Sequence, residues 1–159
     1  MSKKVAYVTG GMGGIWSALL RDRRSREESL RIEQTAMELL DFVGLNGREN
    51  DSASVLPYGQ QRLLEVARAL AAKPKLLLLD EPAAGLNHSE TEHLATVISA
   101  IVKRGVSVLL IEHDMNLVMK IANKVVVIDF GKKIAEGSPQ DVQRSPEVLD
   151  AYLGGVEYA

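Results

Sequence analysis

The sequence contains no cysteine, which excludes a disulfide framework and a thiolate metal site and favours a reducing compartment. Its apolar runs are far shorter than the roughly 20 residues that cross a bilayer, and its N-terminal lysines precede no apolar signal core. We therefore expect no membrane span and no secretion signal. A net charge of −2 gives no reason to expect nucleic acid as the main partner.

A phosphate-binding loop is also missing, because Gly-x-x-x-x-Gly-Lys-Ser/Thr occurs nowhere in the sequence. The single Gly-Lys pair is Gly131-Lys132. It lies between two apparent strands, at residues 125–130 and 133–136, and is predicted to form a hairpin turn. Two short helices should follow, begun by Ser138-Pro139 and Ser145-Pro146.

The 159 residues suffice for one domain, and the run that organises it is Leu76 to Leu79 followed by Asp80 and Glu81. Four aliphatic residues in a row predict a strand buried on both faces, as in a parallel sheet covered by helices. Ligands bind at the carboxyl edge of such sheets, and a carboxylate pair there suits Mg²⁺-phosphate chemistry. The alternative is a strand capped by solvated acids.

A second strand is predicted at residues 106–111, after a helix that we expect to begin at a Ser89–Glu92 capping box and to end at Gly105. Strand, helix and strand in succession imply parallel pairing. His113 follows the second strand. It should therefore share an edge with Glu81, either as a functional group or as a structural histidine.

Leu56-Pro57-Tyr58-Gly59-Gln60-Gln61-Arg62 leads into a predicted helix that ends near Lys73-Pro74. A glycine and polar residues at a helix amino end leave free amides in the positive field of the dipole, which makes an anion site. The alternative is an ordinary helix start with Gly59 as a turn residue.

A run of arginines precedes an earlier predicted helix and is either solvated surface or a contact with a partner. We expect this helix to start at a Ser25–Glu28 capping box and to stop at Gly44. Its apolar stripe is predicted to be core and comprises Ile32, Ala36, Met37, Leu40 and Val43.

The first 15 residues contain a possible strand at 5–8 and a glycine-rich turn. This segment resembles the amino terminus of short-chain dehydrogenases, although Trp16 replaces the last glycine of that pattern and no Tyr-x-x-x-Lys pair follows. We favour a leader that is foreign to the fold.

The ordered motifs of the remaining chain resemble the ATP-binding subunit of ABC transporters. These motifs are a signature at 56–62, a Walker B strand at 76–81, a D-loop at 84–87 and a switch histidine at 113. The residues that make up these motifs are similar to those of branched-chain amino acid importers. The resemblance implies an α/β fold, namely a partial P-loop NTPase domain with a parallel sheet core, helices on both faces, a C-terminal hairpin and short helices. Residues 16–72 would form the helical signature region, and residues 73–159 would run from Walker B to the end.

The resemblance also implies roles for the site residues. Asp80 would help hold Mg²⁺, Glu81 would polarise the hydrolytic water, and His113 would contact the γ-phosphate of ATP. The signature and D-loop residues would bind nucleotide across a sandwich dimer; they are Tyr58, Gly59, Gln60, Gln61 and Asn87. A second ATP-binding subunit and transmembrane permease subunits would be the partners, at the cytoplasmic face of the cell membrane.

Two departures from the family pattern concern single residues: Pro57 stands where the signature serine is usual, and Asn87 where the D-loop aspartate is usual. A larger departure is the absence of the Walker A and glutamine loops. We therefore expect a C-terminal part of an importer ATPase that does not hydrolyse ATP alone. The alternatives are a fragment that only pairs with intact subunits and, remotely, an NAD(P)-dependent reductase.

Overall fold

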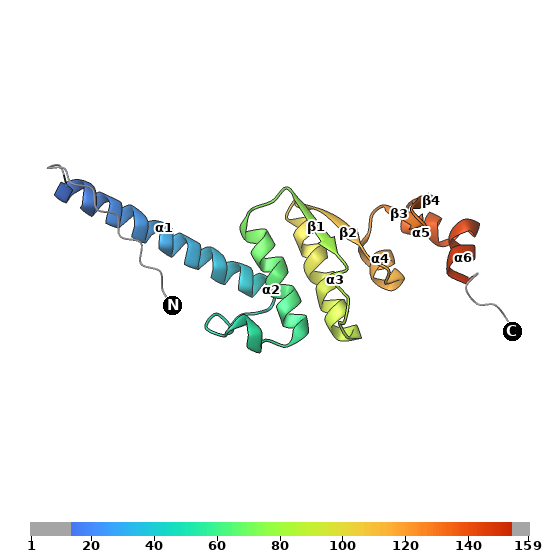
Figure 1. The fold of residues 1–159 in the computed structure, drawn as a ribbon, viewed down its shortest axis with the longest axis horizontal. Coiled ribbons are helices and arrows are strands. Elements are labelled where there is room, and N and C mark those ends of the chain that lie inside the picture. The colour runs from blue at the N-terminus through green and yellow to red at the C-terminus, as the bar shows by residue number, and fades with distance from the viewer. Residues whose placement is uncertain (1–13, 154–159) are drawn as a thin grey trace. The chain divides into compact units, whose positions relative to one another are not determined.

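The structure is a computed structural model that describes the backbone of residues 14–153 and the side chains of residues 26–151. The strand expected at residues 5–8 and the glycine-rich turn before Gly14 lie outside the described residues. The elements follow one another along the chain as in Figure 1: α1 (Gly14–Phe42), η1 (Ala53–Val55), α2 (Tyr58–Ala71), β1 (Leu76–Asp80), α3 (His88–Lys103), β2 (Ser107–Ile111), α4 (Met115–Ile121), β3 (Val125–Asp129), β4 (Lys132–Gly137), α5 (Pro139–Gln143) and α6 (Pro146–Leu153).

The first helix is longer than the sequence suggested. By its internal contacts the chain divides into two units, Met1–Glu38 and Leu39–Ala159, and α1 starts in the first and ends in the second. The prediction that this helix begins at Ser25 is wrong, because α1 already starts at Gly14. The intervening residues include several arginines and no proline, so nothing breaks the helix there.

The predicted apolar stripe of α1 is only partly core. Ile32 and Met37 are 64% and 48% exposed, and Ala36 is also exposed. The described part of the Met1–Glu38 unit is α1 alone, so no second element of that unit covers these side chains. Leu40 and Val43, which belong to the second unit, do pack into its core.

The strands β1 and β2 pair in parallel, with Leu76 opposite Ser107 and Asp80 opposite Ile111. The predicted parallel pairing is thereby confirmed. The expectation that residues 76–79 are buried on both faces is wrong: Leu77 is 5% exposed, but Leu76 and Leu78 are 53% and 65% exposed. Only one face of the pair has cover within the part of the chain that the structure describes, so the predicted helices on both faces are not found.

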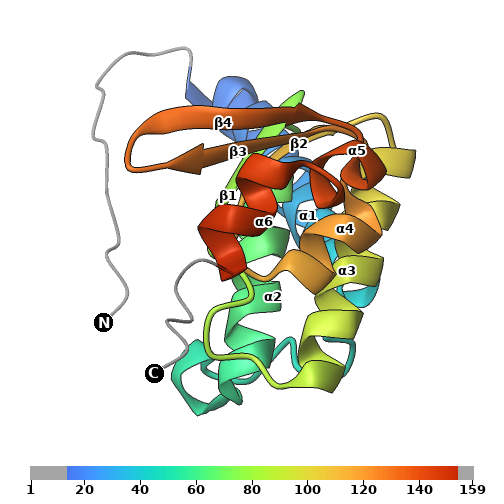
Figure 2. The same cartoon turned by 90° about the vertical axis from the view of Figure 1, so that its right-hand side faces the viewer.

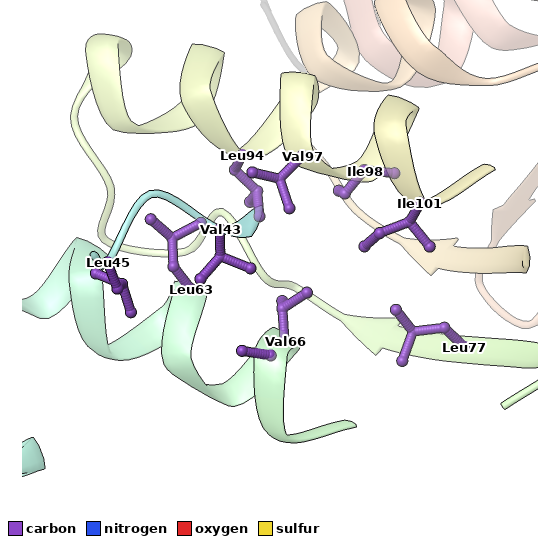
Figure 3. Close-up of a cluster of buried hydrophobic side chains, with 10 residues drawn as sticks. Val43, Leu45, Leu63, Val66, Leu77, Leu94, Val97, Ile98 and Ile101 are labelled. Carbon is purple, nitrogen blue, oxygen red and sulfur yellow. The ribbon is translucent and has the colours of Figure 1, made fainter. Parts of the chain in front are cut away.

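The covered face of β1 and β2 packs on a core supplied mainly by α2 and α3. Figure 3 shows these side chains converging from the two helices, from β1 and from the segment after α1. The buried members are Val43, Leu45, Leu63, Val66, Ala67, Leu77, Leu94, Val97, Ile98 and Ile101. This core fixes the position of α2 relative to the carboxyl edge of β1.

Two helices end in the Leu39–Ala159 unit beside the glycines that were predicted to terminate them. Gly44 and Gly105 have φ values of 80° and 85° just beyond α1 and α3, in the left-handed region that favours glycine. His93 of α3 also lies 3.1 Å, ring nitrogen to carbonyl oxygen, from Val43, the residue after α1. The segment that follows α1 is therefore tied to α3.

The hairpin of β3 and β4 is antiparallel, as predicted, with a bulge between Val127 and Ile128. Its turn is one residue earlier than expected, because Asp129 pairs with Lys132 and leaves Phe130 and Gly131 as the loop. Positive φ angles of 44° and 76° at these two residues match the twist of a two-residue hairpin. The short helices α5 and α6 cover one face (Figure 2), around Val125, Val127, Val142 and Val148.

Over the described residues, no helix combines the length and the hydrophobicity that crossing a membrane requires.

Candidate nucleotide-binding site

Asp80 and Glu81 lie at the carboxyl edge of the parallel strand pair. Asp80 is the last residue of β1 and pairs with Ile111, the last residue of β2. The Glu81 amide donates a hydrogen bond of 2.9 Å to the Ile111 carbonyl, which extends the pairing by one residue. The segments that follow both strands therefore start side by side.

Glu81 and His113 are brought together at this edge, as the parallel pairing predicted. His113 Nδ1 lies 3.6 Å from Glu81 Oε1, and the two side chains are 73% and 54% exposed. Glu81 has a φ of 44°, which is uncommon for a residue other than glycine and turns the chain sharply after β1. The two groups can thus act together on a ligand that approaches from solvent.

Glu112 also stabilises this edge, although no role was predicted for it from the sequence. Its Oε1 accepts a hydrogen bond of 2.8 Å from the Ala83 amide, and its Oε2 accepts one of 3.2 Å from the His113 amide. It therefore ties the loop after β1 to the segment after β2. The available signal was its position, since Glu112 follows β2 as Glu81 follows β1.

The second predicted group lies at the start of α2. Pro57 is the N-cap residue and makes no side-chain capping hydrogen bond. Gln61 turns back so that its Nε2 donates to the Leu56 carbonyl at 2.8 Å, whereas the buried Oε1 of Gln60 has no partner among the described residues. The first-turn amides of α2 are thus not capped by the side chain that precedes them.

Tyr58 packs against the loop after β1. A Cβ atom added at Gly85, whose φ is 78°, would lie 3.1 Å from Tyr58 Cε1. Arg62 Nη2 donates a hydrogen bond of 2.6 Å to the Tyr58 hydroxyl. A hydrogen bond to Glu65, and to a smaller extent the one to Tyr58, raises the pKa of Arg62, so the guanidinium stays charged.

Asn87, predicted as a binding residue, is the N-cap of α3. Its side chain accepts from the Glu90 amide at 3.0 Å, and Glu90 Oε2 accepts from the Asn87 amide at 2.9 Å. This reciprocal capping box corrects the prediction that Ser89 and Glu92 start the helix. The sequence contains two overlapping capping patterns, Asn87–Glu90 and Ser89–Glu92, and in the structure only the pattern that begins at Asn87 caps the helix.

Glu92 instead pairs with Lys120 of α4, and this hydrogen bond lowers the pKa of the Glu92 carboxyl.

Among the described residues, no three or more His, Asp and Glu side chains gather closely enough to hold a metal ion by themselves. Mg²⁺ usually keeps several waters and is held by one or two carboxylates together with substrate phosphates. Asp80, exposed at the strand end, could supply one such carboxylate ligand.

The predicted residues thus fall into two groups joined by the loop 81–87. Asp80, Glu81 and His113 share the sheet edge. Tyr58, Gly59 and Asn87 meet around Gly85 and Glu90. The carboxylates and histidine at one end of this loop have the chemistry to bind a metal-chelated phosphate, and the uncapped helix amides near its other end can bind an anion separately.

Comparison with protein families gives two matches. Residues 2–84 match a model described as ABC transporter, and residues 132–158 match one described as branched-chain amino acid ATP-binding cassette transporter.

Curated relatives include two branched-chain amino acid transport ATP-binding proteins. BraF of Pseudomonas aeruginosa is 47% identical over 133 residues, which cover 83% of this chain and 51% of BraF. LivG of Escherichia coli K12 is 42% identical over 145 residues, which cover 89% of this chain and 56% of LivG. The chain therefore spans about half the length of these relatives.

Solved structures of ATP-binding cassettes share the fold. The ADP conformation of a cassette from an ABC transporter has a TM-score of 0.72 at 29% identity, over 78% of this chain and 50% of that one. A nucleotide-free cassette has a TM-score of 0.71 at 28% identity, over 77% and 50%. These similarities, together with the parallel strand pair, confirm the predicted α/β fold of an ABC ATPase domain. With one family model matching more than half of its 159 residues, the chain belongs to the ABC transporter family.

Proposed function

We propose that this chain is the C-terminal part of the ATP-binding subunit of an ABC importer that takes up branched-chain amino acids. The observation that carries the proposal is the meeting of Glu81 and His113 at the edge where the family motifs place nucleotide chemistry. The substrate class comes from the relatives BraF and LivG and from the match at residues 132–158. None of these similarities points to a reductase.

In this proposal Glu81 accepts a hydrogen bond from the attacking water and orients it, because its carboxylate is exposed at the strand end. His113 donates a hydrogen bond to the terminal phosphate from the neighbouring segment, and Glu112 holds the His113 backbone in place. Asp80 would hold Mg²⁺ directly or through its waters. A bound Mg²⁺ would supply neutralising charge for phosphate oxygens.

The remaining predicted residues serve the partner subunit. The start of α2, with Tyr58, Gly59, Gln60 and Gln61, would face the nucleotide of a second ATP-binding subunit, and Asn87 would support that interface from the loop. Permease subunits in the cell membrane would receive the resulting motion on the cytoplasmic side.

The function can be tested with a chimera in which residues 16–159 replace the matching part of BraF. We expect the chimera to restore uptake of labelled leucine in cells that lack BraF. Glu81→Gln should abolish uptake, because the neutral amide cannot polarise the attacking water as the carboxylate does. Glu49→Gln, which changes an exposed carboxylate in the loop after α1, should not. A chimera that is expressed and folded but transports nothing would contradict the proposal.

The chain alone should bind Mg-ATP weakly, because it contains no Gly-x-x-x-x-Gly-Lys-Ser/Thr loop to hold the phosphates. Calorimetry should show no micromolar binding, and turnover should equal that of the Glu81→Gln variant. Micromolar affinity, or turnover that Glu81→Gln removes, would show that another loop replaces the phosphate-binding loop.

A further inference from the structure

Glu90 occupies a special place in the first turn of α3. Its carboxylate accepts a hydrogen bond from the Asn87 amide, and its own amide donates to the Asn87 side chain. The side chain is half-buried. Its partial burial requires cover from another part of the chain.

The cover over Glu90 comes from Gly59, a buried residue in the first turn of α2. A Cβ atom added to Gly59 would lie 2.6 Å from Glu90 Cδ and 3.0 Å from Glu90 Cγ. Such approaches are much closer than real side chains allow, so the Glu90 side chain fits against α2 only because residue 59 has no side chain. Gly59 is in regular helix, where glycine is otherwise unfavourable.

Tyr58 supplies a second contact between the same two segments, because its ring lies against Gly85. The start of α2 therefore touches the loop after β1 through Tyr58 and touches the start of α3 through Gly59. Glu90 therefore contacts α2 at Gly59 and also accepts a hydrogen bond from the loop at the Asn87 amide.

We propose that Glu90 is a positioning residue that seats the start of α2 on the loop 81–87, and that Gly59 is a glycine in order to admit it. The coupling links residues 59 and 87, which the proposed function places at the interface with a second subunit. Its functional meaning rests on that proposed function, but the coupling itself does not.

The arrangement makes a specific prediction for Gly59→Ala. The new methyl group has to displace the Glu90 carboxylate, which sits at the end of a flexible side chain and can swing away. Doing so breaks its hydrogen bond to the Asn87 amide, on a different segment. A substitution in α2 should therefore expose an amide in the loop before α3.

Amide hydrogen exchange by NMR on the full chain, without nucleotide, tests this. Relative to the amide of Ile98 in the middle of α3, Asn87 should exchange about tenfold faster in Glu90→Ala and in Gly59→Ala. Glu90→Gln should stay within about twofold of the parent, because its amide oxygen still accepts from Asn87. Glu92→Ala, a matched change on the same helix, should also leave Asn87 unchanged.

The double variant separates coupling from simple loss of stability. Once Glu90 is alanine the methyl of Gly59→Ala meets no carboxylate, so the second change should have no further effect on Asn87. Unchanged exchange at Asn87 in Gly59→Ala would overturn the proposal, as would additive effects in the double variant. A failed uptake chimera with the exchange pattern intact would refute the transport function alone.

Discussion

At the residue scale, Glu81 combines the carboxylate on which the proposed function depends with a strained backbone. Its φ of 44° is left-handed, a conformation that costs about 1–2 kcal/mol for residues with a side chain. The turn places its carboxylate toward His113 instead of continuing β1. Strain of this kind tends to persist where the surrounding structure enforces it, here through the Glu81 amide bonded to Ile111 and the Glu112 carboxylate bonded to Ala83.

We expect Glu81→Gly to be more stable than Glu81→Ala by about 1 kcal/mol, since both remove the carboxylate but only glycine accepts this φ freely. Urea denaturation of the two variants measures the difference. Equal stabilities, or a more stable alanine variant, would show that residue 81 does not hold a left-handed backbone in solution.

Glu136 provides a pH-dependent contact on the C-terminal hairpin. Hydrogen bonds from Lys124 and Lys133 lower the pKa of Glu136 from 4.5 to about 2. Because the folded-state pKa lies below the unfolded value, this contribution to stability is complete above about pH 4.5 and is lost as the pH falls toward 2. Lys124→Ala should raise the Glu136 pKa toward 4.5, whereas Lys132→Ala should not; carboxyl NMR titration checks both. A Glu136 midpoint near 4.5 in the parent chain would contradict the pairing.

At the scale of single elements, local sequence signals explain where most helices begin and end. Ser138 caps α5 through a reciprocal bond with Asp141, and proline occupies the first helical position. Gly105 ends α3 in a left-handed conformation. The exception is the hairpin turn, where Phe130 holds a φ of 44° and is 99% exposed. A bulky residue at that position is unfavourable, and no packing in the described structure compensates for it.

Phe130→Asn should stabilise the hairpin by about 0.5–1 kcal/mol, because Asn-Gly is a preferred pair for a two-residue turn with positive φ angles. The unfolding free energy from urea titration should rise, while Phe130→Ala should change it little. A loss of stability in Phe130→Asn would indicate that Phe130 makes a contact that this turn geometry does not include.

At the scale of the whole molecule, the dominant feature is a sheet face that no described residue covers. Leu76, Leu78, Leu109 and Ile111 are all more than half exposed and lie on one face of the paired strands β1 and β2. The part of this chain that matches the relatives covers only about half of their length. A contiguous apolar face of this kind, next to open strand edges, favours association with other chains.

We therefore expect the isolated chain to self-associate. Leu78→Lys together with Leu109→Lys should shift it toward monomer in light scattering, since two charges would have to be buried at the contact. Val126→Lys, at an exposed apolar position of β3, is the matched control and should leave the association unchanged. A monodisperse monomer of the parent chain at micromolar concentration would contradict this expectation.

Most elements were predictable from the sequence because their signals are local. Glycine after α1 and α3, proline in the first turns of α5 and α6, and the aliphatic runs of β1 and β2 each act within a few residues. Parallel pairing followed from the strand–helix–strand order, and it was enough to bring Glu81 and His113 to one edge. The order of motifs likewise identified the family without coordinates.

What the sequence could not decide depends on contacts between distant segments. Four leucines in a row indicate a buried strand, but burial requires cover on each face, and Leu76 and Leu78 remain more than half exposed. Asn87 and Ser89 both offer a capping box, and only the folded chain chooses Asn87–Glu90. For the same reason the sequence could not explain why residue 59 is glycine, because the Glu90 side chain that lies against it comes from 31 residues further along the chain.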